Sequence, residues 1–185
     1  MSSARSVSAW QVDRSRYGKG AWLVQPSFWA VAVYRFGRWT MNAPLPVRGV
    51  AHALYFAAYS VVRLLTGIEI PRGANIGPGL LIHHFGGIVI HPQAQVGARC
   101  TMRQGVTLGT RHESGYPPRL GSDVTLGAYA QVLGNISVGD GVTIGAMAVV
   151  LTDISPGRTA VGNPARVLPS SPRNESAMPD RPTAA

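Results

Sequence analysis

Aliphatic side chains recur at every sixth position over a long central stretch of this 185-residue chain. The series has two extra residues after Ile82 and a twelve-residue step after Leu108. Its members are Ile70, Ile76, Ile82, Ile90, Val96, Met102, Leu108, Leu120, Leu126, Val132, Val138, Ile144 and Val150. Glycine directly follows the aliphatic residue at positions 77, 97, 109, 121, 127, 139 and 145, and a small or apolar residue stands four positions after most members.

A six-residue period is too long for one face of a helix and does not match the simple alternation of a strand. It is typical of a parallel β-helix, in which each hexad forms one short strand and one turn, and three hexads form a triangular coil of about 18 residues. We expect the aliphatic side chains to stack along the axis as the core. The glycines are expected where the chain turns tightly and where a Cβ would obstruct the next coil. A β-sandwich is disfavoured because its turns are irregularly spaced.

The repeat is interrupted twice, and interruptions of a solenoid are where functional segments tend to be inserted. Residues 82–90 (IHHFGGIVI) contain the two added residues and the adjacent pair His83 and His84. Residues 109–119 (GTRHESGYPPR) lack the pattern over two hexads, after which the register returns unshifted. The second interruption therefore predicts a loop that leaves the prism and lies over its flank.

Residues 1–66 are predicted to form a helical segment. The stretch 1–20 is polar, and we expect it to be mobile or loosely docked. A helix is predicted over 27–41, because Pro26 and Ser27 suit a helix start, and a second helix over 47–65 after a proline-containing turn.

Two roles are open for this helical segment. It either caps the open end of the solenoid, or it forms a docking hairpin for a membrane surface or another subunit, using its aromatic residues with Arg35, Arg38, Arg48 and Arg63. Its most apolar run, residues 50–65, is too short and too polar for a membrane span.

The positive charge of the chain is concentrated near the N-terminus. The net charge is +9, and residues 1–69 carry eight basic and two acidic side chains, whereas residues 70–185 carry nine and six. Such an excess suits nucleic acid or an anionic membrane surface. No recognition helix, aromatic-basic motif or zinc spacing accompanies it, so we predict no nucleic-acid partner.

The single cysteine, Cys100, occupies a core-facing position of the repeat, so no disulfide framework is expected. The N-terminus lacks the apolar region of a secretory signal. We therefore expect a cytoplasmic protein, with peripheral contact at the inner face of the membrane if the helical segment docks there. Residues 169–185, rich in Pro and Ser, are predicted to be a disordered tail.

His84 is the best candidate for a general base, because an imidazole titrates near neutral pH and can take a proton from an attacking hydroxyl. His83 is expected to point the other way if the backbone is extended there. Glu69 lies fifteen residues before His84. With an 18-residue coil the residue stacked on Glu69 would be Gly87, so a contact that orients the imidazole is permitted. The alternative is that the two histidines merely decorate a surface strand.

A zinc site is the competing chemistry. Histidines on neighbouring coils of a β-helix can bind zinc, and the chain offers His83, His84, His91 and His112. Their spacing does not predict convergence from two faces, and no second layer of carboxylates is evident. We therefore predict no metal.

Three blocks of the sequence resemble the serine O-acetyltransferases, within the hexapeptide-repeat acyltransferases. They are GANIGPGLLIHHFGGIVI, QGVTLGT and LGAYAQVLGNISVGDGVTIGAMAVVLTDISPGRTAVGNPAR, and they lie within residues 67–168. The resemblance implies that this domain is a left-handed parallel β-helix. It also implies a homotrimer with acetyl-CoA between neighbouring prisms and direct acetyl transfer to a hydroxyl.

Residue by residue, the resemblance makes His84 the catalytic histidine and Glu69 the equivalent of the aspartate that orients it. His83 stands where the family has an acid that helps hold the amino group of serine.

The external loop departs from the family's pattern. The family carries an Arg-His pair shortly before a proline, which binds the serine carboxylate and assists the base. Aligned on Pro118, those positions are Tyr116 and Pro117, while Arg111 and His112 lie several residues earlier. The contacts that define an amino-acid acceptor are thus altered.

The resemblance also indicates a surface for the acetyl donor. The backbone of Gly109 and Thr110 and the small side chains of Ala128 and Ala146 match places where the pantetheine arm lies against the coils. Arg158 and Arg166, near the end of the repeat, are either ligands of the CoA phosphates or ordinary solvated surface residues.

The sequence therefore predicts an acetyl-CoA-dependent O-acetyltransferase. Its acceptor is the hydroxyl of L-serine or of a sugar in surface polysaccharide, and these two stay equally open. The alternative from another class is a non-catalytic or zinc-dependent β-helix protein of the carbonic-anhydrase-like kind.

Overall fold

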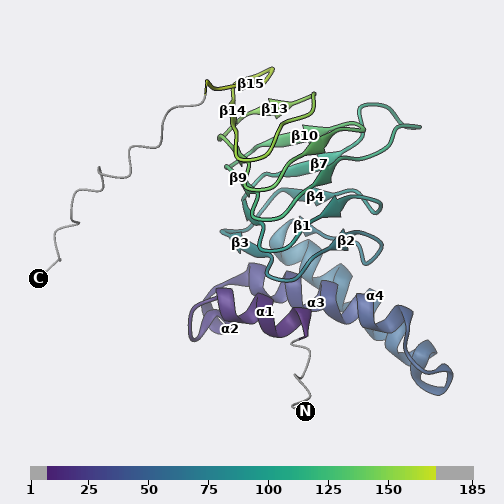
Figure 1. Cartoon of the computed structure of the whole chain (residues 1–185). Coiled ribbons are helices and arrows are strands. Elements are labelled where there is room, and N and C mark those ends of the chain that lie inside the picture. The colour runs from purple at the N-terminus through teal and green to yellow at the C-terminus, as the bar shows by residue number, and fades with distance from the viewer. Residues whose placement is uncertain (1–7, 170–185) are drawn as a thin grey trace, which may run out of the picture.

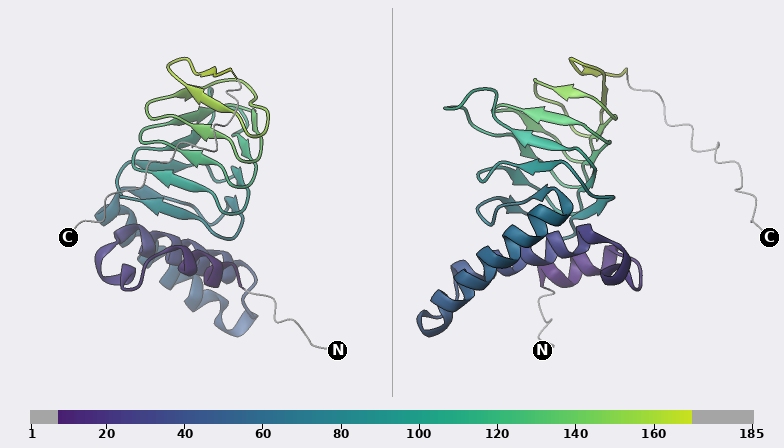
Figure 2. Two further views of the ribbon diagram at one scale, coloured as in Figure 1. Left: turned by 60° about the vertical axis from the view of Figure 1, so that its left-hand side comes forward. Right: turned by 180° about the vertical axis from the view of Figure 1, so that it is seen from behind.

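The protein is a parallel β-helix that stands on a layer of helices (Figures 1 and 2). The computed structural model describes residues 8–169. The chain passes through three sheets in turn, and all pairings between successive coils are parallel. The parallel β-helix predicted from the six-residue period is therefore confirmed.

Three sheets form the sides of the prism. Sheet A contains β1 (Ile68–Glu69), β4 (Ile88–Ile90), β7 (Thr107–Gly109), β10 (Gln131–Leu133) and β13 (Val149–Val150). Sheet B contains β2 (Asn75–Ile76), β5 (Gln95–Val96), β8 (Arg119–Leu120) and β11 (Ser137–Val138). Sheet C contains β3 (Leu81–His83), β6 (Thr101–Arg103), β9 (Thr125–Leu126), β12 (Thr143–Ile144), β14 (Thr159–Val161) and, antiparallel to β14, β15 (Arg166–Val167). We call the turns between them the A–B, B–C and C–A corners.

The coils differ in length. Register partners on sheet A are Glu69 and Val89, Val89 and Thr107, Thr107 and Gln131, and Gln131 and Val149. The separations are thus 20, 18, 24 and 18 residues. The expectation that Gly87 stacks on Glu69 is wrong, because the two added residues lengthen the first coil and bring Val89 there. The third coil carries the predicted loop, which projects from the prism at the level of β7 (Figures 1 and 2).

The core is the predicted column of aliphatic side chains. All thirteen members of the series are 5% exposed or less. Cys100, Ala130 and Val142, four positions after a member of the series, are fully buried as well. The column runs through successive coils of the prism, so each coil rests on the one before it.

The glycines that follow the aliphatic residues allow the backbones of successive coils to come close together. A Cβ on Gly77 would lie 2.7 Å from the backbone nitrogen of Ala98 and 2.8 Å from the carbonyl carbon of Gly97. The second expected reason, a tight turn that needs positive φ, does not apply to these seven glycines. Positive φ occurs instead at other corner residues, including Tyr129 and Met147.

Within the described residues, four helices precede the β-helix: α1 (Ala9–Arg16), α2 (Ala21–Val24), α3 (Pro26–Met41) and α4 (Leu45–Thr66). The two helices predicted over 27–41 and 47–65 are confirmed as α3 and α4. Among the described residues, α4 is the one helix long and apolar enough to cross a membrane, a property that core helices of soluble proteins share.

The expectation that residues 1–20 are loosely docked is wrong for α1. Ser8 and Gln11 form a capping box at its start, a signal present in the sequence. Asp13 on α1 is fully buried, and its carboxylate accepts hydrogen bonds from the backbone nitrogens of Gly79 and Leu80 on the first coil. Residues 1–7, and the tail residues 170–185 for which disorder was predicted, lie outside the described residues.

The helices close one end of the prism, as the capping role predicts. The hydroxyl of Tyr34 on α3 donates to the carbonyl of Ala74 and accepts from the nitrogen of Ile76. Ser27 donates to the carbonyl of Ile82, and Tyr17 accepts from the nitrogen of the same residue. The exposed backbone edge of the first coil is thus hydrogen-bonded by helix side chains instead of water.

Candidate active site

His84 lies at the C–A corner of the first coil, directly after β3. Its φ is 65°, a left-handed conformation that Tyr129 and Met147 also have at the same corner of later coils, and its side chain is exposed. On β3, before the corner, His83 pairs with Arg103, 20 residues later in the chain. On β4, after the corner, Val89 pairs with Thr107, only 18 residues later. The two added residues therefore lie within this corner, which carries the predicted base away from the regular stack.

His83 belongs to strand β3 and faces outward on sheet C. Its register partner on β6 is Arg103, and both side chains are exposed. Partial burial lowers the pKa of His83, and the positive charge of Arg103 lowers it further. The imidazole beside the predicted base is therefore held in its neutral form more strongly than an ordinary histidine.

Glu69 lies on β1, on the sheet that the corner leads into. Its carboxylate oxygen lies 3.7 Å from a guanidinium nitrogen of Arg63, and both side chains are about half exposed. No hydrogen bond joins Glu69 and His84 among the contacts of the described residues. The backbones do approach, since the nitrogen of Ile88 at the end of the corner donates to the carbonyl of Gly67.

Gln104 stands at the C–A corner one coil above, and sequence reasoning did not single it out. Its Oε1 is buried and has no hydrogen-bond partner within the described part of the chain. The next residue, Gly105, donates from its nitrogen to the carbonyl of Gly86 in the corner of His84. A buried acceptor without a partner is costly, which makes Gln104 a candidate for contact with a bound donor.

Ala128 and Ala146 continue the same corner on the coils above. Tyr129 donates from its nitrogen to the carbonyl of Gln104, and Met147 donates to the carbonyl of Ala128. Gln104, Ala128 and Ala146 therefore form a column along the C–A edge, with small side chains in its upper part.

Gly109 and Thr110 lie at the other end of sheet A, at the A–B corner where the loop leaves the prism. A Cβ built on Gly109 would lie 3.5 Å from the nearest carbon of Leu133, an ordinary van der Waals distance. A methyl group at this position would therefore not clash with the neighbouring coil, in contrast to Gly77. One chain does not bring these two residues to Ala128 and Ala146.

The two predicted phosphate ligands differ. Arg158 is half-buried, and its guanidinium donates to the carbonyl of Leu168 at 2.9 Å. Arg166 is exposed on β15. Both lie at the end of the prism opposite the helices.

The external loop also belongs to the A–B side. Arg111 lies against the coil, and its guanidinium donates to the carbonyls of Leu133 and Leu151. His112 and Tyr116 line a cavity of about 310 Å³ together with Arg111. Within one chain this loop lies across sheet A from His84, so the predicted loop and the predicted base are not brought together.

The four histidines considered for zinc are split between corners. His91 follows β4 at the A–B corner, where its Nδ1 accepts from the nitrogen of Gln93, and His112 lies in the external loop. His83 and His84 lie at the opposite end of sheet A. Over residues 8–169, no group of three His, Cys, Asp or Glu side chains is placed to hold a metal. The zinc alternative therefore lacks a ligand set in the described part of one chain.

Comparison with known proteins identifies the chain's relatives. Residues 117–152 match the family model described as bacterial transferase hexapeptide (six repeats). Serine acetyltransferase of Synechococcus elongatus is 42% identical over 175 residues, covering 90% of this chain and 68% of that protein. The Helicobacter pylori enzyme is 46% identical over 129 residues, covering 64% and 75%. The soybean serine acetyltransferase solved with serine superimposes with a TM-score of 0.75 at 31% identity, covering 86% of this chain and 68% of that one.

The soybean structure shares the fold over 86% of this chain. An identity of 42% over nine tenths of the chain, with the same fold, is decisive for kinship. The chain therefore belongs to the serine acetyltransferase family and is an acyltransferase of the hexapeptide-repeat kind.

Proposed function

We propose that the chain is an acetyl-CoA-dependent O-acetyltransferase in which His84 is the general base. The observation that carries this role is the position of His84 at an exposed corner lengthened by two residues, at the foot of the small-residue column. His84 takes the proton of the acceptor hydroxyl as its oxygen attacks the thioester carbonyl, and returns a proton to the departing thiolate. Backbone N–H groups at the corner stabilise the tetrahedral oxyanion.

Glu69 is the proposed orienting group. Its carboxylate would hydrogen-bond one imidazole nitrogen of His84, set the tautomer and stabilise the imidazolium that forms in the reaction. This contact requires the half-exposed carboxylate to exchange Arg63 for His84. A loose surface ion pair of this kind is weak, so the exchange costs little.

A homotrimer supplies the rest of the proposed site. The small-residue column and Gly109 with Thr110 lie at opposite ends of sheet A, so one chain cannot enclose the donor with both. Where two prisms pack side by side, the column of one chain can face Gly109, Thr110 and the external loop of its neighbour. Light scattering on active enzyme tests this, and an active monomer would contradict it. We place the enzyme in the cytoplasm.

L-serine is the first candidate acceptor, because the most similar relatives carry its name and the soybean enzyme was solved with it. A specific feature favours a second candidate, a sugar hydroxyl. Tyr116 and Pro117 occupy the family's Arg-His positions, and the guanidinium of Arg111 is already bonded to two backbone carbonyls. The guanidinium of Arg111 is therefore not free to bind a carboxylate.

Thiol release from acetyl-CoA tests the proposed chemistry. His84→Ala should lower the rate at least ~100-fold, the usual scale for loss of a general base. His83→Ala is the matched control, since it removes the neighbouring imidazole and leaves the corner intact. Circular dichroism confirms that both variants fold. A harmless His84→Ala together with a damaging His83→Ala would reverse the assignment.

A further inference from the structure

The helix α4 is apolar on the side that faces away from the protein. Its outward residues are between 47% and 82% exposed: Leu45, Val47, Val50, Leu54, Val61, Leu64 and Leu65. An ordinary surface helix turns such a stripe toward the core. Within residues 8–169 of one chain, nothing covers this apolar stripe over more than five turns of helix.

The inward side of α4 carries the polar contacts instead. Arg48 donates to the carbonyl of Ala43, and Nε2 of His52 lies 3.0 Å from the carbonyl of Thr40. The hydroxyl of Tyr55 accepts from the backbone nitrogen of Arg72 on the first coil. These contacts fix α4 to α3 and to the prism, and the N-terminal end of α4 projects beyond the prism (Figures 1 and 2). The exposed apolar residues are on the side of α4 that these contacts leave free.

The helix α2 extends this apolar surface. Trp22, Leu23 and Val24 are 55%, 69% and 75% exposed. An apolar groove of about 270 Å³ joins α2 to the end of α4, with Trp22, Leu23, Trp29, Val62, Leu65 and Phe85 in its lining. Phe85 is the chain neighbour of His84, so the groove reaches the catalytic corner.

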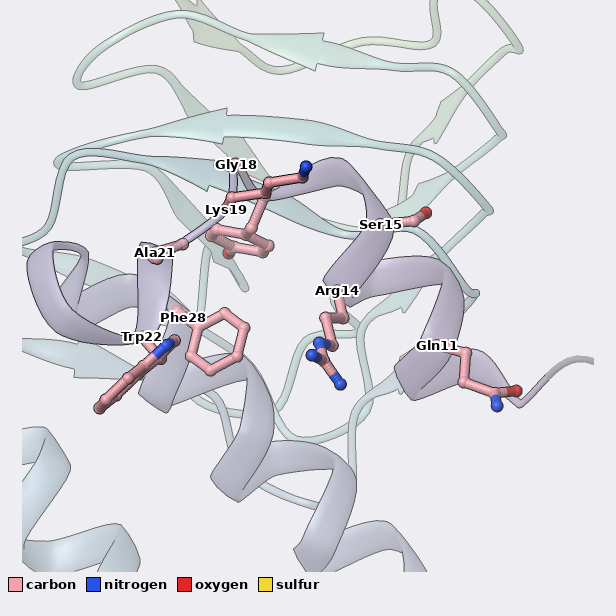
Figure 3. Close-up of a pocket in the computed structure, with 10 residues that line it drawn as sticks. Gln11, Arg14, Ser15, Gly18, Lys19, Ala21, Trp22 and Phe28 are labelled. Atoms are coloured by element: carbon pink, nitrogen blue, oxygen red, sulfur yellow. The ribbon is translucent and has the colours of Figure 1, made fainter.

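The charge around this surface is positive. Residues 9–66 contain seven basic side chains and one acidic side chain, Asp13. Asp13 is fully buried and paired with Arg35, so it presents no negative charge to solvent. Arg14 and Lys19 flank a cavity of about 510 Å³ whose apolar wall includes Trp22 and Phe28 (Figure 3). Cations beside exposed tryptophans suit the phosphates and the interface of a membrane.

We propose that the helical layer docks on the surface of an anionic phospholipid bilayer, with the outward side of α4 and the exposed residues of α2 in the interface. A second copy of this helical layer fits less well, because each copy would bring an excess of positive charge and no exposed acid. This docking does not depend on the acetyl-transfer proposal.

Flotation of the full-length protein with vesicles tests the docking. Vesicles of equal parts phosphatidylglycerol and phosphatidylcholine should carry the protein upward, and pure phosphatidylcholine should bind it roughly tenfold less or weaker. The fluorescence of the exposed Trp22, Trp29 and Trp39 should shift to the blue with the anionic vesicles. Failure to float with anionic vesicles overturns the proposal.

Paired variants locate the contact. The double variant Leu54→Ser with Leu64→Ser removes two exposed apolar side chains from α4 and should lower anionic-vesicle binding roughly tenfold or more. The matched control, Val167→Ser with Leu168→Ser, removes two exposed apolar side chains at the far end of the prism and should bind as the unaltered protein does. Unchanged binding by the α4 variant overturns the proposal. A lower particle mass by light scattering in the α4 variant, with no change in the control, also overturns the proposal. It would show that a second copy of the chain covers the outward side of α4.

Discussion

Asp13 and Arg35 form a two-pronged ion pair between α1 and α3 at the base of the prism. The Nε of Arg35 lies 2.6 Å from one carboxylate oxygen, and the Nη2 lies 3.1 Å from the other. The same guanidinium donates to the carbonyls of Ile76 and Gly77. This pair thus ties two helices to the first coil, at a site from which water is excluded.

Removal of this carboxylate should loosen the helical layer. Asp13→Ala leaves the guanidinium of Arg35 unpaired in a nearly buried site and should cost about 3–5 kcal/mol of the free energy of unfolding. Urea denaturation followed by circular dichroism measures the change. Asp123→Asn is the control, because it removes an exposed carboxylate paired with Arg99, and asparagine tolerates its left-handed backbone. Equal losses in the two variants would contradict the structural role of Asp13.

Two glycine-to-alanine changes should distinguish a glycine needed for the stacking of coils from a glycine needed for binding acetyl-CoA. Gly77→Ala puts a Cβ against the backbone of the next coil and should lower the free energy of unfolding by about 1–3 kcal/mol or more. Gly109→Ala meets its neighbours at ordinary contact distance, so the fold should stay stable while the KM for acetyl-CoA rises. Thermal unfolding and steady-state kinetics give the two readings. An unchanged KM in the stable Gly109→Ala protein would remove Gly109 from the donor site.

The pKa of His83 should respond to its strand partner. Burial is the first cause that lowers this pKa and the charge of Arg103 the second, so Arg103→Gln should raise the value while leaving it below that of a free histidine. In the unaltered protein, His83 of the unfolded chain takes up a proton at a higher pH than His83 of the folded protein, because the folded-state pKa is lowered. The contribution of His83 to stability is therefore full above about pH 6.5 and is lost as the pH falls toward the folded-state pKa. NMR titration of the imidazole checks this, and no shift in Arg103→Gln would refute the coupling.

L-serine should be a poor acceptor with a KM in the millimolar range or above. An unpaired carboxylate in a dry site costs several kcal/mol, and the loop presents Tyr116 and Pro117 where a cation is needed. Turnover on a panel of serine, homoserine and sugars measures the preference. The double variant Tyr116→Arg with Pro117→His should improve the KM for serine without changing that for acetyl-CoA. A submillimolar KM for serine in the unaltered enzyme would show that the inference from the loop is wrong.

The prism could be predicted because its rule is local and repeated. Each of Ile70, Ile76 and Ile82 stacks by the same relation to the next coil, so the pattern is visible in the letters of the chain. The 20-residue offset between Glu69 and Val89 was also visible in the sequence, because the two added residues lie between them. The prediction of Gly87 was wrong because it used the regular 18-residue coil.

The sequence predicted which residue types form the candidate site better than it predicted where each residue lies in the fold. His84 stood out as a histidine within a break in the repeat, and the structure places it at an exposed corner. The distribution of Gly109 and Ala128 over two corners depends on which sheet each hexad enters, and hexad spacing does not distinguish the sheets. Gln104 was missed because its unpaired oxygen is a property of packing that the sequence does not display. The outward apolar side of α4 is likewise visible only once its inner side is known.

The unequal coils carry a consequence for how such an enzyme can change. A two-residue insertion inside a packed helix or strand shifts the residues that follow it, whereas an insertion in a surface loop is tolerated. Here the coil with His84 and the coil with the external loop absorb two and six residues at corners, and the strands that follow resume their stacking. Mutation can therefore lengthen, shorten or replace the corner of His84 and the external loop, and so change the acceptor specificity. The buried column of aliphatic side chains need not change.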